Sequence, residues 1–173
     1  VDACKELGAS VLESGMSFES SMSKVEALSG ASADEMEQLK LKAQEMGKAT
    51  KFTATESADA FSYMALAGWD TSEMLDGIGG ILDLAAASEM DLATASDIVT
   101  DNLSAFGLTA ADSGRLVDQM AYAMSHSNTD TAQLGEAWKN CAATSTQLGY
   151  SLEDTTAALM VMADSGIKGG EAG

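Results

Sequence analysis

The chain contains no proline, a single histidine and two cysteines, and only 5% of its 173 residues are aromatic. Proline is the strongest helix breaker, whereas alanine, leucine and methionine, which form helices well, are plentiful. Aromatic and β-branched residues are sparse, so β-strands have little support. These absences predict an all-α protein, and the length suits either a single domain or two small ones.

Basic side chains are also scarce, with nine against 27 acidic ones and a net charge of −18. Residues 1–51 hold six basic and nine acidic residues, whereas residues 52–173 hold three basic and eighteen acidic ones, a net charge of −15. A surface of that sign repels phosphate groups, so we expect no direct nucleic-acid binding. A solvated helical surface is the favoured interpretation, ahead of a functional acidic face.

The sequence also lacks targeting and membrane signals. Its first six residues do not form a signal peptide, and its longest charge-free run, residues 140–152, is too short and polar to cross a bilayer. Cys4 and Cys141 lie far apart without a CxxC pattern, which is typical of small core residues in a reducing compartment. Because the chain starts at Val1 and stops at Gly173 just after a cap signal, we expect an excerpt of a longer protein.

One local pattern recurs four times: a glycine, a large apolar residue and a polar residue, with an acid three positions further on. Glycine suits the left-handed position after a helix, and the polar residue and the acid have the spacing of a reciprocal helix cap. The fourth copy is Gly166-Ile167-Lys168 with Glu171. The pattern predicts structural helix-cap turns at Gly68, Asp70, Gly107, Thr109, Gly149, Ser151 and Gly166.

Apolar periodicity predicts roughly eight helices. We expect residues 1–29 to form one long N-terminal helix, with a kink allowed near Gly15, that continues an upstream coiled coil and mediates self-association. We expect residues 30–173 to form a core of helical hairpins that continues past residue 173. The hairpin caps recur about every 40 residues, which is typical of stacked two-helix units, although a compact bundle is favoured over a regular solenoid. The helix at 151–165 is apolar nearly all round, so we expect it to be central.

No catalytic, cofactor-binding or metal-binding residue is predicted. His126 lies in a polar turn and is interpreted as a structural residue at a helix end. The glycines of residues 77–80 lack a preceding strand and a Lys-Ser/Thr pair, so they favour close helix packing over a phosphate loop. The eleven methionines are predicted to fill the core, with three candidates for an exposed partner surface, Met64, Met90 and Met124.

A set of motifs along residues 32–173 carries a family resemblance. They include Thr50-Lys51-Phe52-Thr53-Ala54-Thr55-Glu56, Leu66-Ala67-Gly68-Trp69-Asp70, Leu103-Ser104-Ala105-Phe106-Gly107-Leu108, Ser127-Asn128-Thr129-Asp130, Gly149-Tyr150-Ser151-Leu152-Glu153-Asp154 and Ser165-Gly166-Ile167-Lys168-Gly169-Gly170-Glu171. Together these motifs resemble the core segment shared by tape measure proteins of long-tailed phages and prophages. The resemblance covers more than four fifths of the chain.

The resemblance implies a structural protein of tail assembly that helps to set tail length and occupies the tail tube before DNA ejection. It implies tail assembly chaperones, tail tube subunits and tail-tip proteins as partners, synthesis in the bacterial cytoplasm and residence in the virion tail. A helical-repeat interaction module without catalytic activity is the alternative, and a cell-wall hydrolase fragment is the least favoured one.

Overall fold

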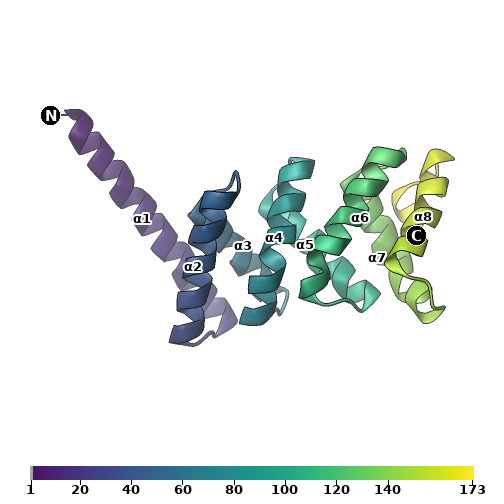
Figure 1. The fold of residues 1–173 in the computed structure, drawn as a ribbon, viewed down its shortest axis with the longest axis horizontal. Coiled ribbons are helices and arrows are strands. Elements are labelled where there is room, and N and C mark those ends of the chain that lie inside the picture. The colour runs from purple at the N-terminus through teal and green to yellow at the C-terminus, as the bar shows by residue number, and fades with distance from the viewer. Residues whose placement is uncertain (1) are drawn as a thin grey trace. The chain divides into compact units, whose positions relative to one another are not determined.

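The structure is a computed structural model that describes residues 2–173, with side chains from residue 13 onward. Within those residues it contains eight α-helices, two 3-10 helices and no strand, which confirms the all-α prediction (Figure 1). The elements are α1 (Asp2–Ser29), α2 (Ala33–Ala49), α3 (Ala54–Leu66), α4 (Thr71–Ser88), α5 (Leu92–Phe106), η1 (Ala110–Asp112), α6 (Ser113–His126), α7 (Thr131–Gln147), α8 (Leu152–Asp164) and η2 (Gly169–Glu171).

Side-chain caps define several helix starts. Before α2, the Ser32 Oγ accepts a hydrogen bond from the Glu35 N–H, and the Glu35 carboxylate accepts one from the Ser32 N–H at 2.8 Å. Thr53 and Glu56 form the same reciprocal pair at the start of α3. Such pairs satisfy backbone N–H groups that have no partner inside the helix, so they fix where each helix begins.

The chain divides into two compact units, residues 1–78 and residues 79–173, and the division falls inside α4. In the first unit, α3 packs against both α1 and α2. Its core contains the fully buried side chains of Val25, Leu39 and Phe61, one from each of these helices. Helix α1 runs without a break through Gly15, where the sequence allowed a kink.

The second unit is built as two layers of helices. Helix α5 lies beside α7 in one layer, and α6 lies beside α8 in the other, so the hairpin α5–α6 stacks on the hairpin α7–α8. The fully buried Trp138 of α7 contacts Phe106 of α5 edge-on, with ring centroids 5.7 Å apart. The caps of α5 and α7, Asp91 and Asp130, are 39 residues apart, in agreement with the predicted period.

Two of the glycines in α4 lie at close contacts. A Cβ at Gly77 would overlap the Trp69 ring, and a Cβ at Gly80 would lie 2.9 Å from Ser113 of α6. Nothing lies within 4 Å of the corresponding position at Gly79. Close packing, the predicted reason for these glycines, therefore holds at Gly77 and Gly80 and is absent at Gly79.

The expected central position of the last helix is wrong. Helix α8 packs on α6 and α7, but Val161 in its middle is 69% exposed, and Met160 and Met162 are only half-buried. Apolar residues cover nearly the whole circumference of α8, yet neighbouring helices cover only part of it. Composition alone does not tell which face of a helix a neighbour covers.

Candidate functional site: turns and ties of the helical repeat

The predicted glycine turns share one backbone geometry. Gly68, Gly107, Gly149 and Gly166 all have positive φ, between +66° and +91°. At each turn, the residue after the glycine donates its N–H to the carbonyl five positions back, as Leu108 does to Leu103 at 2.9 Å. The glycine itself donates to the carbonyl three positions back, as Gly107 does to Ser104 at 3.1 Å. This pair of bonds is the Schellman motif, which ends a helix in a left-handed residue.

The polar residues after three of these glycines make side-chain caps at the next element, whereas Lys168 after Gly166 makes none. The Asp70 carboxylate accepts the Glu73 N–H at 2.9 Å, and the Ser151 Oγ accepts the Asp154 N–H at 3.1 Å. The N–H and hydroxyl of Thr109 donate to the Asp112 carboxylate, as those of Ser151 do to Asp154. Thr109 differs in that it leads into the 3-10 helix η1 before α6, where the Asp112 N–H donates to the Thr109 carbonyl at 2.9 Å. These caps leave a short, fixed connection within each hairpin.

Polar side-chain contacts also tie elements of the second unit together across the hairpins. Each joins residues separated by 36 to 43 positions, which is close to one repeat. The four contacts are Ser88 to Thr131 at 2.6 Å, Lys139 to Asp101 at 2.7 Å, Arg115 to Glu153 at 2.7 Å, and the Asn128 N–H to Asp164 at 2.8 Å. Two of them, Lys139 to Asp101 and Arg115 to Glu153, therefore join equivalent helices of successive hairpins, α5 to α7 and α6 to α8.

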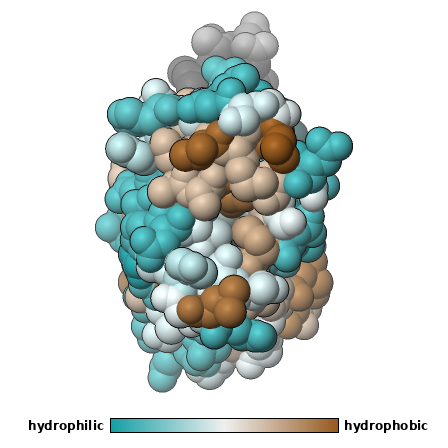
Figure 2. Space-filling view, turned by 90° about the vertical axis from the view of Figure 1, so that its right-hand side faces the viewer, coloured by the Kyte–Doolittle hydropathy of each residue, from teal (hydrophilic) through white to brown (hydrophobic). Residues whose placement is uncertain are grey.

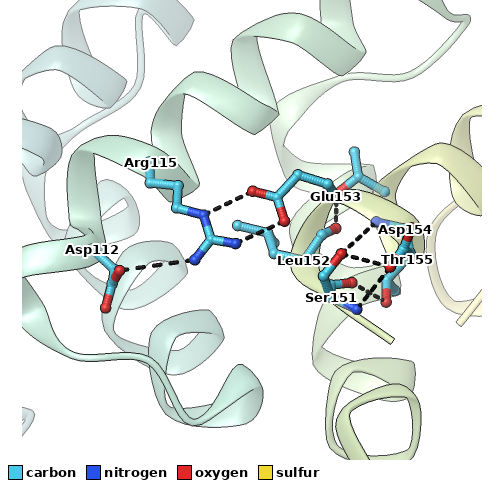
Figure 3. A network of polar contacts seen from close by, with 8 residues as sticks. Asp112, Arg115, Ser151, Leu152, Glu153, Asp154 and Thr155 are labelled. Carbon is cyan, nitrogen blue, oxygen red and sulfur yellow. Dashed lines mark hydrogen bonds and ion pairs between the residues drawn. The ribbon is translucent and has the colours of Figure 1, made fainter. Parts of the chain in front are cut away.

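The tie between α6 and α8 is the most developed of these contacts (Figure 3). The Arg115 guanidinium donates two hydrogen bonds to the Glu153 carboxylate, each 2.7 Å long, and lies 3.9 Å from Asp112. Hydrogen bonding to Arg115 lowers the pKa of Glu153 from 4.5 to about 2. The same bond raises the pKa of Arg115. Bidentate pairs of this kind fix orientation as well as adding energy.

Sequence comparisons place the chain in a known protein family. A profile of the family described as "Phage-related minor tail protein" matches residues 40–173. The chain belongs to this family. The resemblance predicted from the motifs is thereby confirmed.

Two relatives of this chain carry more specific names. A "Tape measure protein" of Pneumococcus phage Dp-1 is 39% identical over 165 residues, which is 95% of this chain and 14% of that protein. A "Probable tape measure protein" of Escherichia phage P2 is 26% identical over 168 residues, which is 96% of this chain and 21% of that protein. The chain thus spans less than a quarter of either relative, and no solved structure matches it.

The histidine and the described cysteine of the chain lie among helix-end and interhelical contacts. The His126 ring is stacked on Tyr122, with centroids 4.2 Å apart, and its Nδ1 lies 2.9 Å from the Tyr122 carbonyl oxygen in the last turn of α6. Cys141, expected in the core, is only half-buried, and burial raises the pKa of its thiol. Cys4 lies outside the described side chains.

The described residues of the chain offer no metal site. Among the described side chains, no group of three histidine, cysteine or acidic residues could hold a metal ion. None of the described helices combines the length and the apolar character that a membrane crossing needs. Of the three methionines considered for a partner surface, Met64 is fully buried, and Met90 and Met124 are half-buried.

Sequence reasoning missed the ties between hairpins. Arg115 and Lys139 are two of the three basic residues in positions 52–173, and each pairs with an acid 38 positions away. A search for opposite charges one repeat apart would have found both pairs. Because this region has eighteen acidic residues and only three basic ones, such a search has to start from the basic residues.

Proposed function

We propose that the chain is a structural, non-enzymatic segment of a tape measure protein. In this role it is made in the bacterial cytoplasm, occupies the tube of the virion tail and helps to set tail length before DNA ejection. The observation that carries the proposal is the 39% identity to the tape measure protein of phage Dp-1 over 95% of this chain. The alternative, a general helical-repeat interaction module, has no comparable support.

The repeat gives the proposal a physical scale. A single extended helix rises about 1.5 Å per residue, so one repeat of 39 residues would span about 60 Å. Packed helices lie about 8–10 Å apart, so a folded hairpin adds only about 10 Å along a stack. Removing one repeat should therefore shorten the tail by a length between these two values. A shortening near about 10 Å would indicate that the segment is folded into hairpins inside the tube, and one near about 60 Å would indicate a single extended helix.

The test is an in-frame deletion of residues 91–129 in the phage or prophage that encodes the protein. This deletion joins Met90 to Asp130, so one helix cap replaces the equivalent one at Asp91. Electron microscopy should find tails shortened by between about 10 and about 60 Å. Gly79→Ala, which meets no neighbour within 4 Å, is the control and should leave the length unchanged. Tails of normal length in the deletion mutant would overturn the proposal.

The proposed role also includes partners. Tail assembly chaperones, tail tube subunits and tail-tip proteins would contact the whole tape measure protein.

A second proposed contact is self-association. Residues 1–29, which precede the hairpin core at 30–173, would continue an upstream coiled coil that self-associates. Met16 on α1 is 67% exposed, as a residue in a helix–helix seam would be in a single chain. Met16→Glu should weaken self-association in sedimentation experiments. Leu41→Glu, at a 58% exposed position on α2, should not, and equal effects would refute the coiled coil.

Direct DNA binding is not included in the proposed role. The net charge of −15 on residues 52–173 would keep this segment from adhering to DNA that shares the tube. Filter binding at low salt should therefore detect no retention of DNA. Tight binding that weakens with added salt would contradict this aspect of the proposal.

A further inference from the structure

A groove of about 780 Å³ opens in the second unit between α7 and α8. Figure 2 looks onto the α8 end of the chain, where hydrophobic residues gather in patches on the surface. Four residues that line the groove are Cys141 and Ser145 from α7 and Ala158 and Met162 from α8. Ala158 is exposed, and the other three are half-buried.

The repeat relates this groove to a surface on the preceding hairpin. Aligning the caps Asp91 and Asp130 in sequence pairs α5 with α7. Aligning Thr109, which caps η1 directly before α6, with Ser151, which caps α8, pairs η1 and α6 together with α8. The four groove residues then correspond, in order, to Asn102, Phe106, Leu116 and Met120.

These four counterparts are at most 5% exposed. Three of them face α7 directly. Phe106 contacts the Trp138 ring edge-on, and a Cβ at Gly135 of α7 would lie 3.6 Å from both the Asn102 amide nitrogen and the Met120 Cε. On the hairpin α5–α6, this surface is therefore the one that the next hairpin covers. The groove is formed by the corresponding residues of the next hairpin, α7–α8.

The C-terminal residues already follow the order of the repeat. Helix α5 packs on α7, and the short helix η2 after α8 packs on α7 in turn. A Cβ at Gly173 would overlap the Ala137 carbonyl and lie 2.7 Å from the Asn140 Cβ, so the backbone passes very close to α7 here. Gly135 has the same role where α5 crosses α7. Glycine thus permits a close approach in both places.

We propose that the groove between α7 and α8 receives a further two-helix unit of the same repeat, which begins at η2. Its first helix would extend along α7 and its second would lie on α8, as α7 and α8 lie on α5 and α6. Ser145 and Ala158 stand where the preceding hairpin has Phe106 and Leu116. The smaller side chains leave room, so the occupant carries larger apolar residues at its contacts. This inference stands independently of the tape measure role.

The test compares thiol reactivity at two alanines. In a background with Cys4→Ser and Cys141→Ser, Ala158→Cys places a thiol in the groove, and Ala143→Cys places one on an exposed face of α7 outside it. The counterpart of Ala143 by the same cap alignment is Ser104, which is exposed, whereas that of Ala158 is the fully buried Leu116. Alkylation rates are measured in this 173-residue chain and in the full polypeptide that contains it.

We expect the Ala158→Cys thiol to react at least about tenfold more slowly in the full polypeptide, and the Ala143→Cys thiol to react at a rate within about twofold in both. Equal rates for Ala158→Cys in the two chains would overturn the inference. Protection already present in the 173-residue chain and rising with its concentration would assign the groove to a second copy and overturn it as well. Neither result would alter the tail-length test.

Discussion

The two units, residues 1–78 and residues 79–173, differ in how many basic residues they contain and in which helices their ion pairs join. The first unit holds six of the nine basic residues, and its interhelical ion pair joins Lys40 of α2 to Glu19 of α1 at 2.8 Å. The second unit has three basic residues, and two of them, Arg115 and Lys139, join successive hairpins. Two of the three cations of the second unit therefore pair with an acid 38 positions away, which is close to one repeat.

This contrast suggests that the two units are different kinds of structure. The first contains the 28-residue helix α1, which has no counterpart one repeat later, and α3 packs against both of its neighbours there. The second is a stack in which each layer places a helix beside its equivalent. Substitutions at comparable positions in the two units should therefore change the stability of the chain by different amounts, because the first unit is a packed three-helix core and the second is a stack of similar hairpins.

The largest contrast is expected at two glycines of α4 on either side of the division. Gly77→Ala should destabilise the chain by about 1–3 kcal/mol, because its methyl group would overlap the Trp69 ring. Gly79→Ala should stabilise it by up to about 1 kcal/mol, because alanine replaces glycine in a helix with nothing within 4 Å. Denaturant unfolding measures both changes, and changes of the same sign would contradict the packing described for α4.

Gly107→Val should cost more than about 1 kcal/mol. The residue has φ +66°, and a β-branched side chain resists positive φ even though nothing crowds the position. A thermal melt compares this variant with Gly114→Ala, a glycine of α6 that also has open space but has no positive φ. An unchanged melting temperature for Gly107→Val would mean that the turn between α5 and α6 tolerates another conformation.

Arg115→Gln should destabilise the chain by about 1 kcal/mol, because Glu153 loses both hydrogen bonds and solvent screens what remains. Lys40→Gln should cost less than about 0.5 kcal/mol, since a lysine ammonium lacks the planar fork of arginine and its pair with Glu19 is solvent-exposed. Urea unfolding of the two variants tests the difference between the units. Equal losses would remove the distinction drawn from their ion pairs.

The smallest effect is a change in the pH dependence of stability. The pKa of Glu153 is about 2 in the folded chain against an ordinary value of 4.5. Its contribution is complete above pH 4.5 and is lost as the pH falls from there towards 2. Glu153→Gln should therefore lose less stability than the parent chain over this range. Melting temperatures at several pH values test this, and parallel curves would exclude the Arg115 tie as their cause.

The sequence predicts the turns at helix ends, but it does not predict which residues from distant helices contact each other. Gly107 and Gly149 were found as turns because a glycine, an apolar residue and a cap are contiguous and act within one turn of helix. The Arg115 to Glu153 pair depends on how α6 lies beside α8, which no local pattern encodes. The exposure of Val161 was missed for the same reason, since an apolar residue does not reveal whether a neighbour is present.

If the hairpins of the second unit are interchangeable, the isolated chain should still fold after deletion of residues 91–129. The shortened chain joins α4 to α7 through an equivalent cap, so circular dichroism should find an unchanged helix content per residue and one cooperative melt at a lower temperature. A marked loss of helix per residue, or a melt without cooperativity, would contradict the claim that the second unit is a stack of equivalent hairpins.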